Sequence, residues 1–264
     1  SLGLVGSEMC IRDSQGVVLR VADFNDRDAL LTVLTQKHGK LTLKARGLRR
    51  KNSPLTAACQ LLALGEFTVF EYRGQYSVNE ARVLNLFQGL RSDMESLSLA
   101  SYFAQVSEVL SQEDYPTPEL QSLLLNCLYA LSELQRPPEQ VKAVFELRAA
   151  CLSGYAPDLF GCHVCGSQAP ARLDLSSGLL ECANCRDASS GGIRIPITAA
   201  MLEAMRFICF CEPKRIFSFR LESKDLRRLA SLTEGYLSTQ LERGFPALEF
   251  YKSLCLQSDK LEAT

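Results

Sequence analysis

The first third of the chain alternates apolar and polar positions in short runs. A period of two is the pattern of a half-buried β-strand. Turn-forming residues separate several of the runs, as in "NDRD", "KHGK" and "RGQ". Five closely spaced strands predict a small β-barrel, and five is the strand number of an OB-fold, although an SH3-like barrel or an open sheet would give the same alternation. The five runs are residues 16–24, 28–35, 40–48, 65–72 and 76–87.

The apolar period changes to that of helices after about residue 90. Leu120, Leu124, Leu128 and Leu131, for example, fall on one face of a helix. The segments "YPTPE" and "QRPPEQ" each place proline where a helix would begin. We therefore predict an α+β protein, in which an N-terminal OB-fold β-barrel is followed by an all-helical domain carrying a four-cysteine subdomain.

These patterns predict the limits of the domains. The first fourteen residues, "SLGLVGSEMCIRDS", have no hydrophobic period, so we expect a non-native or disordered leader there. A disordered tail is expected at the other end. The predicted parts are a leader at 1–14, the OB-fold at 15–90, the first part of the helical domain at 91–160, the cysteine insert at 161–195, the second part of the helical domain at 196–255, and the tail at 256–264.

Four of the eleven cysteines form two identical C-x2-C pairs, sixteen residues apart: Cys162 with Cys165, and Cys182 with Cys185. This spacing is typical of a tetrahedral zinc site, because thiolates favour zinc over magnesium or calcium. Four thiolates leave no open position for water or substrate, so we expect one structural Zn²⁺ per chain. Iron, or two accidental pairs, are the alternatives. His163 is expected to be exposed rather than ligating.

Positive charge gathers in "KHGKLTLKARGLRRK", which contains no acidic residue. Such local density is the electrostatic footprint of a site for a nucleic-acid backbone, although a merely solvated basic face is the alternative. The region 91–160 is acidic instead, and reversing the charges of Glu113 and Asp114 is expected to leave nucleic-acid binding on the barrel in place. The predicted DNA-binding residues are Lys37, Lys40, Lys44, Arg46, Arg49, Arg50 and Lys51.

Other signatures are missing from the sequence. There is no P-loop, dinucleotide fingerprint, zinc-protease motif or nucleophile elbow, and with only two histidines acid–base catalysis has little to work with. We therefore expect no enzymatic activity. No uninterrupted apolar run reaches membrane-spanning length and the start lacks the features of a secretory signal, so a cytoplasmic location is expected.

The order of these parts resembles the RecO family of bacterial recombination mediator and DNA repair proteins. The likeness runs from Gly16 to about Leu254. It rests on "GVVLRVADFNDRDALLTVLTQKHGKLTLKARGLRRKNS", on "GYAPDLFGCHVCG" leading into the first cysteine pair, and on "YLSTQLERGFPALEFYKSL" near the end. The resemblance implies an OB-fold joined to a helical domain with a zinc-binding subdomain. It also implies that the basic positions from Lys40 to Lys51 form the DNA-contacting face.

The resemblance further implies partners and a pathway. Members of the family bind single- and double-stranded DNA, anneal complementary strands and work with RecR in the RecF pathway to replace single-strand binding protein by RecA. The C-terminal tail of single-strand binding protein is acidic and ends in an apolar residue, so it should need an apolar groove rimmed by cations. Lys142 and Arg148, beside the apolar segment "VFELRAACL", are candidates for that groove. A nucleoid-associated protein without membrane contact is implied.

Two other functions remain open from the residues alone. The chain could be an RNA- or ribosome-binding OB-fold protein with a structural zinc. It could also be an enzyme with a zinc ribbon whose catalytic carboxylates have no recognisable motif. Competition between single-stranded DNA and structured RNA would separate the first alternative from a DNA-binding mediator, and metal- or substrate-dependent turnover would identify the second.

Overall fold

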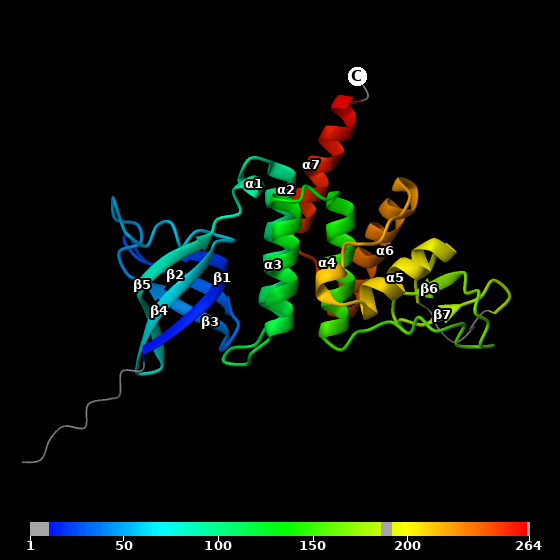
Figure 1. Ribbon diagram of the computed structural model, residues 1–264, viewed down its shortest axis with the longest axis horizontal. Helices are drawn as coiled ribbons and strands as arrows, with labels where there is room; N and C mark the ends of the chain where they lie inside the picture. Colours follow the sequence, from blue (N-terminus) through cyan, green and yellow to red (C-terminus); the bar gives the residue numbers. More distant parts are fainter. Residues whose placement is uncertain (1–10, 186–191, 263–264) are drawn as a thin grey trace, which may run out of the picture. The chain divides into compact units, whose positions relative to one another are not determined.

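The computed structural model describes residues 11–185 and 192–262, which divide between two compact units (Figure 1). The first unit contains the barrel and the helices up to Glu133, together with the chain from Phe245 onward. The second unit runs from Leu134 to Gly244. The predicted α+β class is confirmed, but the helices do not form one domain, because some belong with the barrel and the others with the cysteine insert.

Five strands close into a barrel in the order β1-β2-β3-β5-β4. All neighbours are antiparallel except β3 and β5, which pair in parallel through Leu43–Tyr76 and Lys44–Ser77. This order and the single parallel pair are those of an OB-fold, so the predicted fold is confirmed. The strands are β1 (Ile11–Asp23), β2 (Ala29–Thr35), β3 (Gly39–Ala45), β4 (Leu64–Tyr72) and β5 (Gln75–Asn85).

The interior of the barrel is filled by the apolar members of the alternating runs. Val18, Leu31, Val33, Leu43 and Phe67 are all completely buried and belong to one cluster. On β3 and β4 the neighbours of the core residues lie on the outer face, because successive side chains of a strand alternate between its faces. The same alternation that predicted the strands therefore fixes which residues the barrel presents to a ligand.

Strand β1 begins earlier than the sequence pattern indicated. Residues Ile11–Asp13 lie in the segment predicted as a leader, yet they pair with Thr68–Phe70 of β4. The partner strand, distant in sequence, extends β1 where the local pattern shows no period. The rest of the predicted leader, residues 1–10, lies outside the described residues.

Within the residues that the structure describes, four helices complete the first unit: α1 (Gln88–Arg91), α2 (Met94–Leu110), α3 (Pro118–Ser132) and α7 (Pro246–Glu262). Helix α7 packs against α2, where the Tyr102 and Phe245 rings meet edge to face at 5.4 Å. Helix α3 is tied to the barrel by the Gln121 amide, which donates to the Leu34 carbonyl at 3.0 Å. Helix α7 continues to Glu262 through most of the segment predicted as a disordered tail, which corrects that prediction.

The described part of the second unit holds three α-helices and a small sheet. Helix α4 packs against α5 and α6 (Figure 1), and the strands pair in the order β7-β6-β8. Proline begins both α3 and α4, as the sequence predicted. The elements are α4 (Pro138–Leu152), β6 (Arg172–Asp174), β7 (Leu180–Glu181), β8 (Arg194–Pro196), α5 (Ala199–Phe210), η1 (Pro213–Arg215) and α6 (Ser223–Leu241).

Candidate nucleic-acid interface and metal centre

Strand β3 places the first part of the basic segment on the outside of the barrel. Leu41 and Leu43 point into the core, whereas Lys40 and Lys44 lie on the outer face, as their alternate positions predicted. Arg46 follows the end of the strand and is exposed. Strand β3 therefore carries cations on its solvent-facing side, between the β2–β3 turn and the loop that follows β3.

Three of the seven predicted DNA-binding residues are held by other groups of the chain. The Lys40 ammonium donates to the Glu108 carbonyl at 2.8 Å. Lys44 lies 3.7 Å from the Asp28 carboxylate and 4.2 Å from the centre of the Phe24 ring. Arg49 forms an ion pair with Asp23. A phosphate must compete with these partners for each of the three cations.

The loop after β3 is fixed to the β1–β2 loop by backbone contacts. The amide of Gly47 donates to the Asp28 carboxylate at 2.8 Å, and the amide of Arg49 donates to the Arg27 carbonyl at 3.1 Å. The bond from Gly47, with a further bond from Asn25, lowers the pKa of Asp28 below its ordinary value, against the opposing effect of its own desolvation. The two loops therefore form one ordered surface beside β3.

The other four predicted residues are exposed, and none of them forms an ion pair within the described part of the chain. They are Lys37, Arg46, Arg50 and Lys51. Lys37 lies in the β2–β3 turn, and the other three follow the end of β3. These cations are the ones that can neutralise phosphates without first leaving a carboxylate.

A cavity of about 550 Å³ lies on the outer face of β3. The strand 2–3 face and the loops that flank it are where OB-folds bind oligonucleotides. Its lining combines an exposed ring, two lysines, three carboxylates and several polar groups: Phe24, Leu30, Lys40, Leu41, Thr42, Lys44, Glu71, Gly74, Gln75, Tyr76, Glu113 and Asp114.

Two of the lining residues come from the acidic region of the sequence. Reversal of the charges of Glu113 and Asp114 was expected to leave nucleic-acid binding on the barrel in place, and the α2–α3 loop that carries them lies against the start of β3. The Lys40 amide donates to the Gln112 carbonyl at 3.1 Å, and Thr42 donates to the Glu113 carboxylate at 3.3 Å. Sequence position alone could not indicate this contact, because it joins residues about seventy positions apart.

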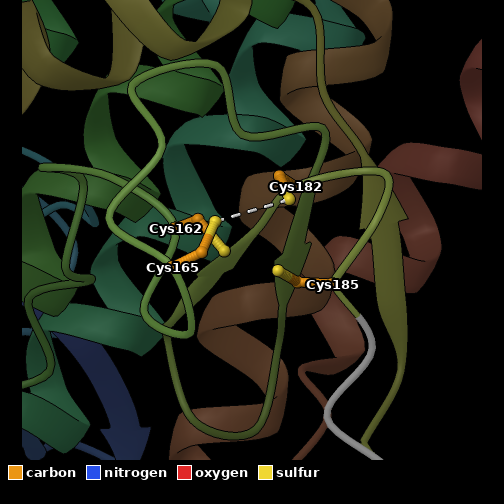
Figure 2. Close-up of side chains that lie close together, drawn as sticks. All are labelled: Cys162, Cys165, Cys182 and Cys185. Atoms are coloured by element: carbon orange, nitrogen blue, oxygen red, sulfur yellow. Dashed lines mark hydrogen bonds between the residues drawn. The ribbon is translucent and has the colours of Figure 1, made fainter.

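The four cysteines of the insert come together as their spacing predicted (Figure 2). Their sulfurs all lie within 4.8 Å of one another, and the Cys165 and Cys182 sulfurs are 3.8 Å apart. Four sulfurs at about 2.3 Å from a central zinc, in a tetrahedron, lie about 3.8 Å from one another. The donor set and its spacing therefore fit a four-coordinate metal with no open position.

Tight turns aim the sulfurs at their common centre. The Gly166 amide donates to the Cys162 carbonyl at 2.8 Å, and Gly166 has a φ of 73°, which favours glycine. Burial raises the pKa of the Cys162 thiol, but the amides of Cys165, Cys182 and Val164 outweigh it and bring the pKa to about 6. The turn thus favours a thiolate, the form that binds metal.

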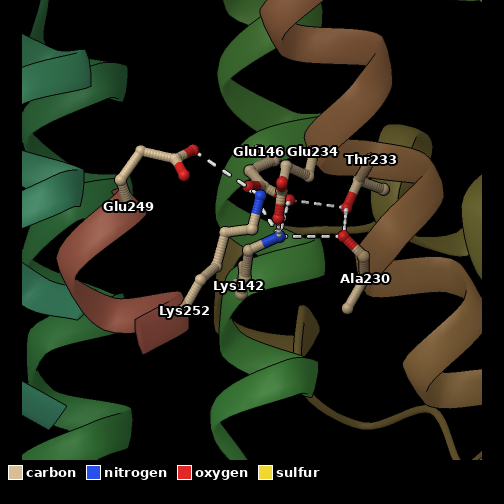
Figure 3. Close-up of polar contacts among 7 residues, drawn as sticks. All are labelled: Lys142, Glu146, Ala230, Thr233, Glu234, Glu249 and Lys252. Carbon is tan, nitrogen blue, oxygen red and sulfur yellow. Dashed lines mark hydrogen bonds and ion pairs between the residues drawn. The ribbon is translucent and has the colours of Figure 1, made fainter. Parts of the chain in front are cut away.

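The predicted partner residue Lys142 is not available to a partner. Its side chain is 5% exposed on α4 and forms ion pairs with Glu146 at 3.0 Å and Glu234 at 2.8 Å (Figure 3). Its ammonium also donates to the Ala230 carbonyl at 2.9 Å. A lysine that is buried and surrounded by acceptors stabilises the packing of α4 on α6, so its assignment to a peptide groove was wrong.

The second predicted partner residue, Arg148, is also used inside the chain. Its guanidinium donates to the carbonyls of Ile208 at 3.0 Å and Cys211 at 3.3 Å, and it also contacts the carbonyl of Cys209. These are carbonyls at the end of α5, which have no partner within the helix and favour a cation. Arg148 therefore caps α5, and its assignment to the groove is corrected as well.

A different apolar groove does lie on the second unit. It has a volume of about 470 Å³ and runs between α5 and the segment before α6. Arg220, at its rim, is exposed, while Arg206 is held by Glu203 and by the Leu159 carbonyl. The lining is Ala200, Glu203, Ala204, Arg206, Phe207, Phe219, Arg220 and Leu221.

Among the described residues, no helix is both long enough and apolar enough to cross a membrane.

Comparison with known proteins gives matches along almost the whole chain. A family model described as "Recombination protein O N terminal" matches residues 9–87, and one described as "Recombination protein O C terminal" matches residues 91–249. A protein of Acetivibrio thermocellus named "DNA repair protein RecO" is 32% identical over 91% of this chain and 96% of its own length. A protein of the same name from Symbiobacterium thermophilum is 28% identical over 93% of this chain and 98% of its own length.

Proposed function

The chain belongs to the RecO family of DNA repair proteins, and from this premise we propose that it is a recombination mediator that binds single- and double-stranded DNA and anneals complementary strands. The proposal includes a place in the RecF pathway, where the protein works with RecR to replace single-strand binding protein by RecA. Family membership favours this function over an RNA-binding protein of the translation apparatus.

One observation carries the proposal for DNA binding. Exposed cations surround the outer face of β3, which is the face that OB-folds use for oligonucleotides. Lys37, Arg46, Arg50 and Lys51 can contact phosphates directly, whereas Lys40, Lys44 and Arg49 keep their partners within the chain and would flank the bound strand. Such contacts position a nucleic acid without reading its sequence, which suits a protein that acts on any strand.

We infer that the C-terminal tail of single-strand binding protein binds in the groove between α5 and the segment before α6. The tail is acidic and ends in an apolar residue. An apolar floor containing Phe207 and Phe219 suits the last side chain, and the exposed Arg220 suits a carboxylate. This groove replaces the site that the sequence suggested around Lys142 and Arg148.

We also propose that the metal is one zinc ion per chain and that its role is structural. Four thiolates are a typical zinc ligand set and fill its tetrahedron. When bound, the ion would join the turn at Cys162 to the turn at Cys182. The protein itself would act without covalent chemistry, by binding and arranging strands, in the cytoplasm and in association with the nucleoid.

Annealing of complementary oligonucleotides coated with single-strand binding protein tests the function. The wild-type chain should accelerate annealing of the coated strands in the absence of any nucleotide cofactor, and Arg220→Ala should reduce acceleration on coated strands more than on bare strands. A chain that binds structured RNA much more tightly than single-stranded DNA, and does not anneal, would favour the translation alternative.

A further inference from the structure

The cavity on the outer face of β3 carries groups that phosphate binding does not explain. We propose that it takes up one unpaired nucleobase, and that it prefers guanine. The inference rests on the proposed binding of single-stranded DNA. In this proposal the binding face has two parts: exposed cations that contact phosphates, and a cavity that holds one unstacked base.

An exposed aromatic ring forms one wall of this cavity. Phe24 lies in the β1–β2 loop and is 51% exposed, whereas Phe67 is completely buried in the barrel core. The Lys44 ammonium lies 4.2 Å from the centre of the Phe24 ring. A half-exposed ring on the binding face of an OB-fold is a surface on which a base can stack.

The carboxylates of the cavity disfavour a phosphate there. Glu71, Glu113 and Asp114 all line it. Of the two lysines on the lining, Lys40 donates to the Glu108 carbonyl and Lys44 lies beside Asp28. Three acids against two cations give this lining a net negative charge, which disfavours a phosphodiester, so the ligand that fits is an uncharged group with hydrogen-bond donors.

Backbone pairing positions the loop that carries two of these carboxylates, Glu113 and Asp114, at the lining of the cavity. The Asp114 amide donates to the Lys40 carbonyl at 3.4 Å, and the Lys40 amide donates to the Gln112 carbonyl at 3.1 Å. The Thr42 hydroxyl donates a hydrogen bond to the Glu113 carboxylate at 3.3 Å. The α2–α3 loop, which carries Glu113 and Asp114 and is called the acidic loop below, thus pairs with β3 like a short extra strand. This pairing places both carboxylates at the cavity in the absence of a ligand.

The preference for guanine follows from the donors on its Watson–Crick edge. A carboxylate is an acceptor with two oxygens, and it pairs best with two adjacent N–H groups. Among the four bases of DNA, only guanine presents two adjacent N–H groups there, at N1 and N2. Enzymes that take a base out of the stack read this same edge.

The first test separates a base pocket from a phosphate site. Phe24→Ala should weaken binding of a single-stranded oligonucleotide by roughly tenfold, the effect of one lost stack, without changing the salt dependence. Duplex binding should be unchanged, because paired bases cannot enter the cavity. Phe250→Ala is the matched control, since Phe250 is also 51% exposed but lies on α7.

The second test uses oligo-dT strands that carry one central dG, dA or dC. The wild-type chain should bind the dG strand severalfold more tightly than the others, and the Glu113→Gln/Asp114→Asn variant should bind all the strands alike. Equal wild-type affinity for the dG, dA and dC strands would overturn the proposal. So would an equal effect of Phe24→Ala on single strands and duplex.

Failure of this proposal is distinguishable from failure of the proposed function. A wild-type chain that binds single strands with an affinity dependent on Arg50 and Lys51, but not on Phe24, retains the function and loses the base pocket. A wild-type chain that binds neither single strands nor duplex refutes both proposals.

Discussion

The Lys142 ammonium lies 3.0 Å from a Glu146 oxygen one turn away on α4 (Figure 3), and neither side chain has more than 5% of its surface exposed. The Thr233 hydroxyl donates to the same carboxylate at 2.7 Å. Two charges removed from water are tolerated because each one finds several partners across the contact between α4 and α6.

Removing Lys142 should therefore be costly. Lys142→Met leaves the buried Glu146 carboxylate without this cation, so we expect the free energy of unfolding to fall by about 3–5 kcal/mol. Denaturant unfolding at neutral pH measures the change. Lys224→Met, which removes an exposed lysine of α6, should change stability by less than about 0.5 kcal/mol. Equal effects of the two variants would contradict a structural role for the buried ion pair.

The same variant should show a distinct pH dependence. Burial raises the pKa of Glu146 above its ordinary value of 4.5, and the charge of Lys142 opposes that rise. The folded chain therefore binds the proton of the Glu146 carboxyl group more tightly than the unfolded chain does. The contribution of this group to stability consequently falls as the pH rises through the raised pKa. Without Lys142 the pKa rises further, so the deficit of Lys142→Met should shrink when the pH is lowered from 7 towards 5.

The metal centre gives a second prediction. Purified wild-type chain should contain close to one zinc per chain, and Cys162→Ser or Cys182→Ser should lose the metal and expose the insert to proteolysis. Cys211→Ser is the control, because Cys211 is a partly exposed cysteine outside the four-sulfur cluster. Metal analysis and limited proteolysis are the measurements. A metal-free wild-type chain with a protease-resistant insert would contradict this prediction, because the insert would then fold without the metal.

The exposed cations of the barrel give a third prediction, which concerns the salt dependence of DNA binding. If Arg50 and Lys51 each neutralise one phosphate, the Arg50→Ala/Lys51→Ala variant should reduce the slope of log affinity against log salt by about 1.4 on single strands. Binding should weaken alike for all sequences, because phosphate contacts carry no base information. Lys214→Ala/Arg215→Ala removes two adjacent cations from the second unit and should leave the slope unchanged. An unchanged slope for Arg50→Ala/Lys51→Ala would mean that these two residues are solvent-exposed cations that do not contact phosphates.

The barrel could be predicted because the alternation of residues such as Lys40, Leu41 and Leu43 is local information. The cysteine cluster could be predicted as well, since each pair lies within one turn. Prediction from sequence failed where the structure depends on a contact between distant segments. Lys142 was assigned to a partner because its acceptors, Glu234 and Ala230, lie about ninety positions away, and the acidic loop was separated from β3 for the same reason.

The groove beside α5 gives a fourth prediction. A labelled acidic peptide with an apolar last residue and a free carboxylate should bind the wild-type chain, and Arg220→Ala should weaken that binding at least about fivefold, as expected for loss of a charge-assisted bond. Fluorescence anisotropy measures both. Arg227→Ala, an exposed arginine of α6 outside the groove lining, is the control. Identical losses in the two variants would indicate general charge attraction rather than a groove.

The attachment of the acidic loop to β3 depends on Gly39, which has a φ of 64° and lies directly against the Tyr115 backbone. A Cβ at this position would overlap the Tyr115 carbonyl, so Gly39→Ala should both strain its own backbone and push the loop away from the barrel. Gly74→Ala is the matched control, because Gly74 has a φ of 73° but open space around its Cβ position. The left-handed conformation costs an alanine roughly 1–2 kcal/mol in either variant. Denaturant unfolding should therefore show a loss for Gly39→Ala that exceeds the loss for Gly74→Ala by about 2 kcal/mol or more, in the range of an overpacked site. Equal losses would mean that the loop yields freely, and that β3 does not hold its carboxylates in place.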